Sequence, residues 1–279
     1  QSELVAKRLR AAGHEVALVP MVTEGDVRPM DMSPGEGVFV AAIARAVLSG
    51  VIDLAVHSAK DVPLEEDPGL AIAAYPERAD PRDVLVTRRG GGSLEALPRG
   101  AIVGTDSPRR AGFLLAARPD LEVIPLHGNV ETRLRRLDEG AADALVLAAA
   151  GMDRLGRHGR IDERFEPDVL APAPGQGALA VQVRQGDARL MELVSAIDDG
   201  DVRLAVEAER EVLRTTGGTC RAPVGALASI SGDEFVLLAG GVNSDGSDKL
   251  VERLKGSRRD AWDLAARLGR RLLAEVALR

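Results

Sequence analysis

The sequence predicts an α/β protein with a smaller α+β unit at its C-terminal end. Short apolar strands alternate with amphipathic helices over the first 154 residues, the pattern of a mostly parallel sheet covered by helices. The length of 279 residues suits two or three domains with sizeable cores. Hydrophobic residues make up 45% and charged residues 28%, which is the balance of a soluble globular protein.

The first part of the chain supplies most of the predicted elements. The stretch 23–37 is rich in glycine, proline and acids and is expected to be a mobile loop. Gly50 ends a helix, and the apolar run after it suits a strand covered on both faces. A similar junction follows Gly140, which leaves open either a duplicated α/β domain or an ordinary helix–strand junction. We expect helices at 2–13, 38–50, 107–119 and 129–140, and strands at 14–22, 51–58, 80–88, 101–104, 121–126 and 142–151.

The later part of the chain changes character. Four prolines and glycines in the segment 171–183 break the alternation, and we expect this segment to carry the chain back across a domain boundary. A long helix at 201–218 follows, then strands at 226–231 and 234–242 and a final helix near 260–278. This order predicts the small α+β domain.

Composition excludes several functions. The formal charge of −7 and the 2% aromatic content argue against a basic, stacking surface for nucleic acid or anionic membrane. No apolar run approaches the ~20 residues of a membrane span, and the N-terminus lacks a secretory pattern. A single cysteine forms no internal disulfide, so we expect a cytoplasmic protein. The four histidines are scattered, so we expect no metal site.

Arg109 and Arg110 are the best local indication of chemistry. Ser107 is a natural N-cap and Pro108 a natural first helical residue, so both arginines lie in the first helical turn. Cations are unfavourable there because this end of the helix dipole is positive. We therefore predict an anion shared by both guanidinium groups, with a solvated surface pair as the alternative.

Other candidates follow the ends of predicted strands, where ligands gather in α/β sheets. Arg133 and Arg154 would extend the anion site. Asp61 follows the buried strand with Lys60 and could act as an acid or base, or simply cap a turn. Cys220 lies in a glycine-flanked loop beside an arginine, so it is either an exposed thiolate or a small buried hydrophobic residue.

Seven segments together resemble the porphobilinogen deaminase family, also called hydroxymethylbilane synthases. HSAKDVP and GNVETRL are each moderately specific, and their order with PGQGA and the loop cysteine is highly specific. The matching segments are LVPMVTEGD (18–26), DLAVHSAKDVP (53–63), DPRDVLV (80–86), residues 102–134, LAAAGMDRLG (147–156), PAPGQGALAVQVR (172–184) and GGTCRAPVGALA (217–228).

The resemblance implies an enzyme that joins four porphobilinogen molecules head to tail, releases ammonia and hydrolyses off the linear tetrapyrrole hydroxymethylbilane. A dipyrromethane cofactor, attached by thioether to Cys220, would prime the chain, and Asp61 would be the catalytic aspartate. The implied cofactor-binding residues are Cys220, Lys60, Ser58, Arg109, Arg110, Arg133 and Asp61. The implied substrate-binding residues are Arg154, Arg133, Arg109, Gln176 and Ser107.

The family fold implies two α/β domains like those of type II periplasmic binding proteins, and a third α+β domain that carries the cysteine. The expected boundaries are 1–76 with 178–196, then 77–177, then 200–279. The family is mostly monomeric, and its opening strand, with an arginine and a serine, would precede Gln1. Glu36, Ala41 and His127 stand where many members have lysine or arginine. They keep open an alternative, a non-catalytic two-domain carboxylate-binding protein or a degenerate relative.

Overall fold

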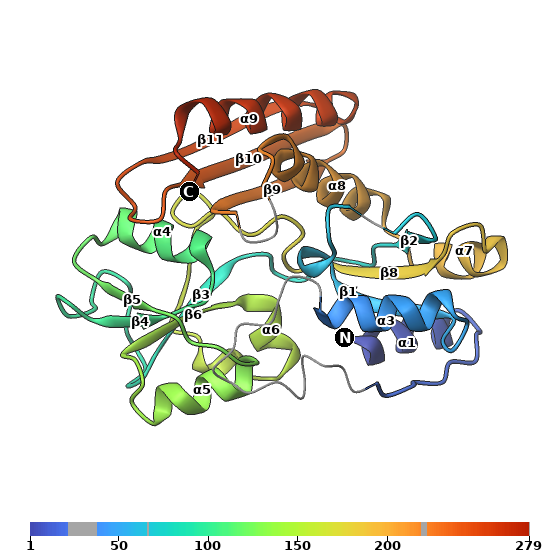
Figure 1. Cartoon of the computed structure of the whole chain (residues 1–279), viewed down its shortest axis with the longest axis horizontal. Helices are drawn as coiled ribbons and strands as arrows, with labels where there is room; N and C mark the ends of the chain where they lie inside the picture. The colour runs from blue at the N-terminus through green and yellow to red at the C-terminus, as the bar shows by residue number, and fades with distance from the viewer. Residues whose placement is uncertain (22–37, 66, 219–221, 279) are drawn as a thin grey trace.

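The computed structural model describes residues 1–21, 38–65, 67–218 and 222–278 and groups them into three units, each built on one sheet (Figure 1). The first unit lies at the lower right of Figure 1, the second at the lower left and the third above both. The first two units combine strands and helices along the chain, and the third is a small α+β unit. The predicted fold class is therefore confirmed.

The first unit has strands in the order β1 (Leu54–Ser58), β8 (Leu179–Arg184) and β2 (Leu70–Ala74). Helix α1 (Ser2–Ala11) buries Val5 and Leu9 against β8, and helix α3 (Val38–Leu48) packs Val47 against β1. Helix α7 (Ala188–Ser195) follows β8. Because β8 arrives from the second unit, segment 171–183 does carry the chain back, as predicted.

The second unit has a sheet in the order β5-β4-β6-β3-β7. Its helices are α4, α5 and α6, which follow the parallel strands. The strands are β3 (Asp83–Thr87), β4 (Ile102–Gly104), β5 (Glu122–Ile124), β6 (Ala144–Ala148) and β7 (Glu163–Arg164), and the helices are α4 (Pro108–Ala117), α5 (Val130–Asp138) and α6 (Ala149–Arg154). A short turn of 3-10 helix, His158–Arg160, precedes β7.

The expectation of mostly parallel sheets is wrong in the first unit and incomplete in the second. Strand β8 runs antiparallel to both β1 and β2, and β3 runs antiparallel to β6 and β7. Both β3 and β8 bring the chain in from the other unit. A strand that enters in this way starts at the edge where the unit's own βα strands end, so it must run in the opposite direction.

The third unit is an antiparallel sheet in the order β11-β10-β9, covered by two helices. Its strands are β9 (Val224–Ser231), β10 (Glu234–Val242) and β11 (Lys249–Ser257), and its helices are α8 (Gly200–Thr215), the 3-10 turn Arg258–Asp260 and α9 (Ala261–Glu275). The sequence did not predict β11, where charged side chains interrupt the apolar pattern. It also missed β2, whose sequence LAIAA has weak strand propensity.

The strand predicted at 14–22 does not form in its described part, residues 14–21. The segment lies opposite β1, and both line a cavity of about 910 Å³. No backbone hydrogen bond joins residues 14–21 to β1 in the described structure. Residues 14–21 therefore do not pair with that strand, although their apolar composition is typical of a strand. The mobile loop expected at 23–37 lies outside the described residues.

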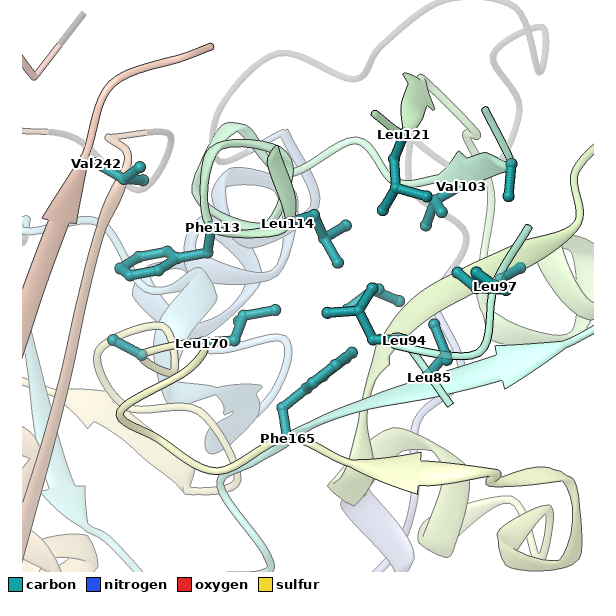
Figure 2. Close-up of a cluster of buried hydrophobic side chains, with 14 of the residues drawn as sticks. Leu85, Leu94, Leu97, Val103, Phe113, Leu114, Leu121, Phe165, Leu170 and Val242 are labelled. Atoms are coloured by element: carbon teal, nitrogen blue, oxygen red, sulfur yellow. The ribbon is translucent and has the colours of Figure 1, made fainter. Parts of the chain in front are cut away.

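The second and third units share one hydrophobic core. Phe113 and Leu114 of α4 project toward Phe165 and Leu170, and Val242 at the end of β10 lies against Phe113 (Figure 2). A side chain at Gly112 would collide with the carbonyl oxygen of Asn243, so α4 and β10 approach as closely as a glycine allows. The third unit therefore fixes the helix whose first turn carries Arg109 and Arg110.

The two segments that connect the first and second units cross at Gly177. The Ala79 amide donates to the Gly177 carbonyl at 3.2 Å, and Gly177 has a φ of +86°. The predicted boundaries at 76/77 and 177/178 fall within these crossing segments, but the domain limits stay a prediction.

Replacing Gly177 by alanine should strongly destabilise the protein. The left-handed backbone alone costs a non-glycine residue about 1–3 kcal/mol, and a Cβ here would also collide with the Ala79 carbonyl oxygen. Urea unfolding gives the loss of free energy. Gly200→Ala is the matched control, because that helical position has nothing within 4 Å of a new Cβ. Equal stability of the two variants would contradict the crossing contact.

Candidate active site

Asp61 lies directly beyond the end of β1, as the sequence predicted. Residues Ala59–Asp61 form a single 3-10 turn, and the Ala59 amide donates to the Ala178 carbonyl at 3.0 Å. Asp61 is exposed, and within the described residues its carboxylate has no hydrogen bond or ion pair. Ser58 ends β1, and its Oγ accepts from Gln1 Nε2 at 2.9 Å. The Asp61 carboxylate is therefore available to a ligand N–H group.

The third unit holds the backbone around Asp61 in place. The buried Arg210 of α8 donates from Nη1 to the Val62 carbonyl at 2.9 Å and from Nη2 to the Pro63 carbonyl at 2.7 Å. Val206, one turn earlier, packs in the same cluster as Ala59 and Val62. The turn that presents Asp61 is thus fixed from a helix about 150 residues away in sequence.

Arg109 and Arg110 share an anion, and in this structure it is the carboxylate of Asp83. Asp83 Oδ1 lies 2.7 Å from Arg110 Nη2, and Asp83 Oδ2 lies 2.8 Å from Arg109 Nη1. All three side chains are buried. Burial would raise the pKa of Asp83, but the two guanidinium groups outweigh it and lower the pKa to about 2. Asp83 is therefore a permanent anion that holds the arginine pair inside the protein.

Arg109 and Arg110 differ in how many of their side-chain N–H donors already have an acceptor in the described structure. Arg110 uses Nε and Nη2 on Asp83 and Nη1 on the Val146 carbonyl at 3.1 Å. Arg109 uses Nη1 alone, on Asp83 and on the Ala171 carbonyl, so its Nε and Nη2 have no partner in the described structure. Ser107 is the predicted N-cap and accepts from the Arg110 amide at 3.3 Å. Contact of either arginine with a cofactor or substrate stays a prediction.

Gln176 connects this buried cluster to Lys60. Its amide nitrogen donates to the Pro81 carbonyl at 2.8 Å and to Asp83 Oδ1 at 3.0 Å, and its Oε1 accepts from Lys60 Nζ at 3.1 Å. Gln176 is only 1% exposed, so the predicted contact with substrate would require it to give up one of these bonds. Burial lowers the pKa of Lys60 to about 8, against the attraction of Asp61.

Arg133 lies on the next helix and joins the same electrostatic cluster. Its Nη2 lies 3.3 Å from Asp106 Oδ2, and its buried Nε has no hydrogen-bond partner within the described residues. Burial and the nearby Arg110 lower its pKa, and Asp106 opposes them. His127, at the position where we expected an arginine in the family, places Nδ1 2.9 Å from Asp106 Oδ1. Asp106 therefore holds both basic side chains.

Arg154 is the last residue of α6 and contacts one of the two crossing segments at Gly177. Its Nη2 donates to the Gly177 carbonyl at 2.7 Å, and burial lowers its pKa. Within the part of the chain that the structure describes, it has no acidic partner. Arg154 thus keeps donors for an anionic group, but its contact with substrate stays a prediction.

Cys220 and Glu36 lie outside the described residues, and α8 ends at Thr215 before the cysteine while β9 starts at Val224 after it. His57 is buried in β1, and burial lowers its pKa, as for a core histidine.

Sequence reasoning missed four charged residues that organise the site: Asp83, Asp106, Glu209 and Arg210. Glu209 is fully buried and accepts from Arg78 Nη1 at 2.6 Å and from the Gly175 amide at 2.7 Å. A signal was present, because Glu209 falls on the apolar stripe of its helix and Asp83 opens a strand that is otherwise apolar. A charge at a buried position needs a partner, and that need marks both residues as members of a network.

The described residues contain no cluster of His, Cys, Asp and Glu able to hold a metal ion, and no helix among them is long and apolar enough to cross a membrane. The fold and the site together define an α/β protein with buried guanidinium groups near strand ends and, within the described residues, an exposed aspartate without a hydrogen-bond partner. Two family models match: the dipyrromethane cofactor binding domain of porphobilinogen deaminase over residues 1–192, and its C-terminal domain over residues 203–276. The chain belongs to the porphobilinogen deaminase family.

Curated relatives agree with this assignment. A porphobilinogen deaminase of Acidothermus cellulolyticus is 48% identical over 99% of this chain and 84% of its own length. One of Roseiflexus sp. is 47% identical over 98% of this chain and 91% of its own length. This is a family of enzymes with a dipyrromethane cofactor.

Solved structures with looser similarity include a periplasmic domain and a periplasmic sulfonate-binding protein. The VFT2 domain of Bordetella pertussis BvgS has a TM-score of 0.43 and 18% identity, covering 70% of this chain and 75% of that domain. A periplasmic sulfonate-binding protein of Methylobacillus flagellatus has a TM-score of 0.42 and 16% identity, covering 75% of this chain and 62% of that protein.

Proposed function

We propose that this chain joins four porphobilinogen molecules head to tail, releases ammonia at each coupling and hydrolyses off hydroxymethylbilane. One observation carries the proposal beyond family membership. The Asp61 carboxylate, without a hydrogen-bond partner in the described structure, attracts the neighbouring Lys60, which also feels the charges of Arg109 and Arg110. Arg110 in turn acts on Arg133, so these basic groups form one electrostatic cluster. Each porphobilinogen unit brings two carboxylates and a pyrrole N–H, which are the groups that such a site would hold.

The residues fit a dipyrromethane cofactor, which is two linked porphobilinogen units. Within the described residues, the buried Arg133 Nε and the Nε and Nη2 of Arg109 have no partner, and these donors suit its carboxylates. When bound through a thioether to Cys220, the group supplies the pyrrole carbon to which the first substrate is joined. We assign its binding to Ser58, Lys60, Asp61, Arg109, Arg110 and Arg133, and substrate binding to Ser107, Arg109, Arg133, Arg154 and Gln176.

Asp61 would supply electrostatic stabilisation. Loss of ammonia leaves the substrate ring electron-poor, and a fixed carboxylate at the ring N–H stabilises the positive charge where it develops. Arg210 holds the turn that presents this carboxylate, so little reorganisation is needed when the charge appears. The arginines orient the ring through its carboxylates and leave Asp61 to face the nitrogen.

A purified chain should be heavier than its sequence by two linked pyrrole units. Cys220 is the one cysteine, so peptide mass mapping has a single possible attachment sulfur. Intact mass spectrometry of protein from cells able to make porphobilinogen tests this, and Cys220→Ser is the control that should keep the unmodified mass. An unmodified parent chain that binds small carboxylates without releasing ammonia from porphobilinogen would instead support the non-catalytic alternative.

We further propose that the enzyme acts as a cytoplasmic monomer without nucleic-acid or membrane partners. The acidic net charge and the low aromatic content support the absence of a nucleic-acid surface. Light scattering at several concentrations tests the monomer, and a mass near twice 29.4 kDa would contradict it.

A further inference from the structure

Asp106 is an acidic residue placed among basic side chains to which we assign carboxylate binding. It lies between β4 and the N-cap of α4, and its carboxylate faces Arg133 of α5 and His127 of the loop before α5. An anion at this place repels any anionic ligand that approaches the same cations. The negative charge is therefore unfavourable for ligand binding unless it has a role of its own.

Capping of α4 does not account for Asp106. Ser107 is the N-cap, and its Oγ accepts from the Arg110 amide at 3.3 Å. In the described structure no backbone N–H group donates to the Asp106 carboxylate, whose partners are the side chains of Arg133 and His127. The positive end of the helix dipole would also attract a carboxylate that is turned toward solvent. The contact with Arg133 therefore needs a separate explanation.

The contact between Asp106 and Arg133 is weak compared with the contacts of Asp83. Asp106 Oδ2 lies 3.3 Å from Arg133 Nη2, and both side chains are 21% exposed. Asp83 is fully buried and lies 2.7 Å and 2.8 Å from its two arginines. A long, partly exposed ion pair costs little to break, whereas a buried pair is held firmly. Asp106 can therefore be exchanged for another anion, and Asp83 cannot.

Arg133 keeps a buried donor that no residue of the described structure accepts. Its Nε–H group is buried and has no hydrogen-bond partner there. Burial and the nearby Arg110 lower the pKa of this guanidinium, and Asp106 opposes them. A buried donor without an acceptor is costly, so it marks a position where an acceptor is expected. A carboxylate of the ligand would supply that acceptor.

Asp106 occupies half of the edge through which a guanidinium prefers to bind a carboxylate. That edge carries Nε and Nη2, and two N–H groups on one carboxylate make a stronger contact than one. Arginines of this chain that bind an aspartate through both Nε and Nη2 include Arg82, Arg110, Arg118 and Arg203. In Arg133 the Nη2 end is taken by Asp106, and the Nε end has no partner in the described structure. A ligand carboxylate that binds the whole edge must therefore displace Asp106.

We propose that Asp106 is a built-in competitor for Arg133: it holds Nη2 in the unliganded chain, and a carboxylate of the ligand displaces it by binding to Nε and Nη2 together. This inference rests on the proposed function, which assigns ligand carboxylates to Arg133. After the exchange Asp106 still has a basic neighbour, because His127 Nδ1 lies 2.9 Å from its Oδ1.

A competitor of this kind makes the binding of carboxylates reversible. Each porphobilinogen unit brings two carboxylates, and the finished chain has to leave the guanidinium groups that held it. When a carboxylate leaves Arg133, Asp106 returns to Nη2, so the half-buried guanidinium regains an anionic partner. The affinity of the site is lower as a result, and release is easier.

A structural role for Asp106 predicts the opposite effect on binding. If Asp106 only held Arg133 in place, Asp106→Asn should weaken the binding of a carboxylate ligand. If Asp106 competes with the ligand, the same variant should bind more tightly, because the ligand no longer displaces an anion or approaches a like charge. The direction of the change in Kd therefore separates the two roles.

The test is a titration of the Cys220→Ser chain with porphobilinogen. This chain lacks the sulfur that would carry the cofactor, so binding is measured without turnover. NMR follows the arginine Nε–H signals, and Arg133→Lys identifies the signal of Arg133. We expect this signal to shift and saturate, and Asp106→Asn to lower the Kd at least about fivefold. An Arg133 signal that does not respond, or a Kd that is unchanged or higher in Asp106→Asn, would overturn the inference.

Three further variants separate charge from shape and folding. Asp106→Glu keeps the charge and should stay within about twofold of the Kd of the Cys220→Ser chain, whereas the neutral Asp106→Ser should bind more tightly, as Asp106→Asn does. Asp138→Asn is the matched control, because it removes the aspartate partner of Arg160 at the end of α5 and should leave the Kd unchanged. Tightening in Asp106→Glu equal to that in Asp106→Asn would refute competition by charge. Urea unfolding confirms that each variant is folded.

Failure of this inference is distinguishable from failure of the proposed function. If the parent chain releases no ammonia from porphobilinogen, the proposed function fails. If the parent chain turns over and neither Asp106→Asn nor Asp106→Ser binds porphobilinogen more tightly, only the competitor role of Asp106 fails.

Discussion

Replacing Asp83 by asparagine should lower the free energy of unfolding by about 3–5 kcal/mol. The change leaves two buried guanidinium groups, Arg109 and Arg110, without the carboxylate that neutralises them. It also weakens the bond from Gln176, so the disturbance should spread to Lys60. Urea unfolding monitored by circular dichroism measures the loss, and turnover should fall with it because the site loses its support.

An exposed ion pair provides the control for Asp83. Asp138→Asn removes the partner of Arg160 in a pair whose side chains are 51% and 38% exposed, and it should cost no more than about 1 kcal/mol. Equal costs for the two variants would refute the special role of Asp83.

The pH dependence of stability gives an independent check on Asp83. Its pKa is about 2 in the folded protein against a usual value of 3.8. The folded pKa is depressed, so the stabilisation is complete above about pH 4 and is lost as pH falls through about 2. The Asp83→Asn variant should lack this part of the acid unfolding curve.

Replacing Asp61 by asparagine should lower kcat about 10²- to 10³-fold and leave the unfolding free energy nearly unchanged. Asparagine keeps the shape of the side chain but removes the charge that would stabilise the positive pyrrole ring. Stability should hold because Asp61 is exposed and has no partner in the described structure. Steady-state formation of hydroxymethylbilane measures the first effect, and urea unfolding measures the second.

Asp233→Asn is the control for Asp61, because Asp233 is an exposed carboxylate in the turn between β9 and β10, far along the chain from the site. It should leave both quantities at parental values. If Asp61→Asn turned over within about threefold of the parent, Asp61 could not be the group that stabilises the developing charge.

Much of the fold could be predicted from the sequence because the signals are local. Helix α4 starts where Ser107 and Pro108 indicate, and β6 forms within the apolar run 142–151, whose last residues begin α6. Gly50 and Gly140 both have positive φ at equivalent helix–strand junctions, which a glycine after a helix indicates on its own. The direction of β3 and β8 could not be predicted in this way, because pairing depends on which unit the chain enters.

In the candidate site, too, some features could be predicted from the sequence and others could not. The sequence indicated that Arg109 and Arg110 share an anion, because two cations at a helix N-terminus need one. It could not indicate that this anion is Asp83, since the carboxylate lies 26 or 27 residues away on a strand and reaches them only when β3 joins its sheet. Arg210 was missed for a similar reason, because its acceptors are backbone carbonyls of a distant turn.

The sequence by itself determined most of the helices and strands, which residues carry charge near strand ends, and which family motifs the chain contains, since each depends on neighbours along the chain. Only the tertiary structure decided which charges neutralise each other and which stay available. Asp83 is neutralised by two arginines, while Asp61 has no partner among the described residues, because burial makes an unpaired charge costly and an exposed carboxylate needs no partner.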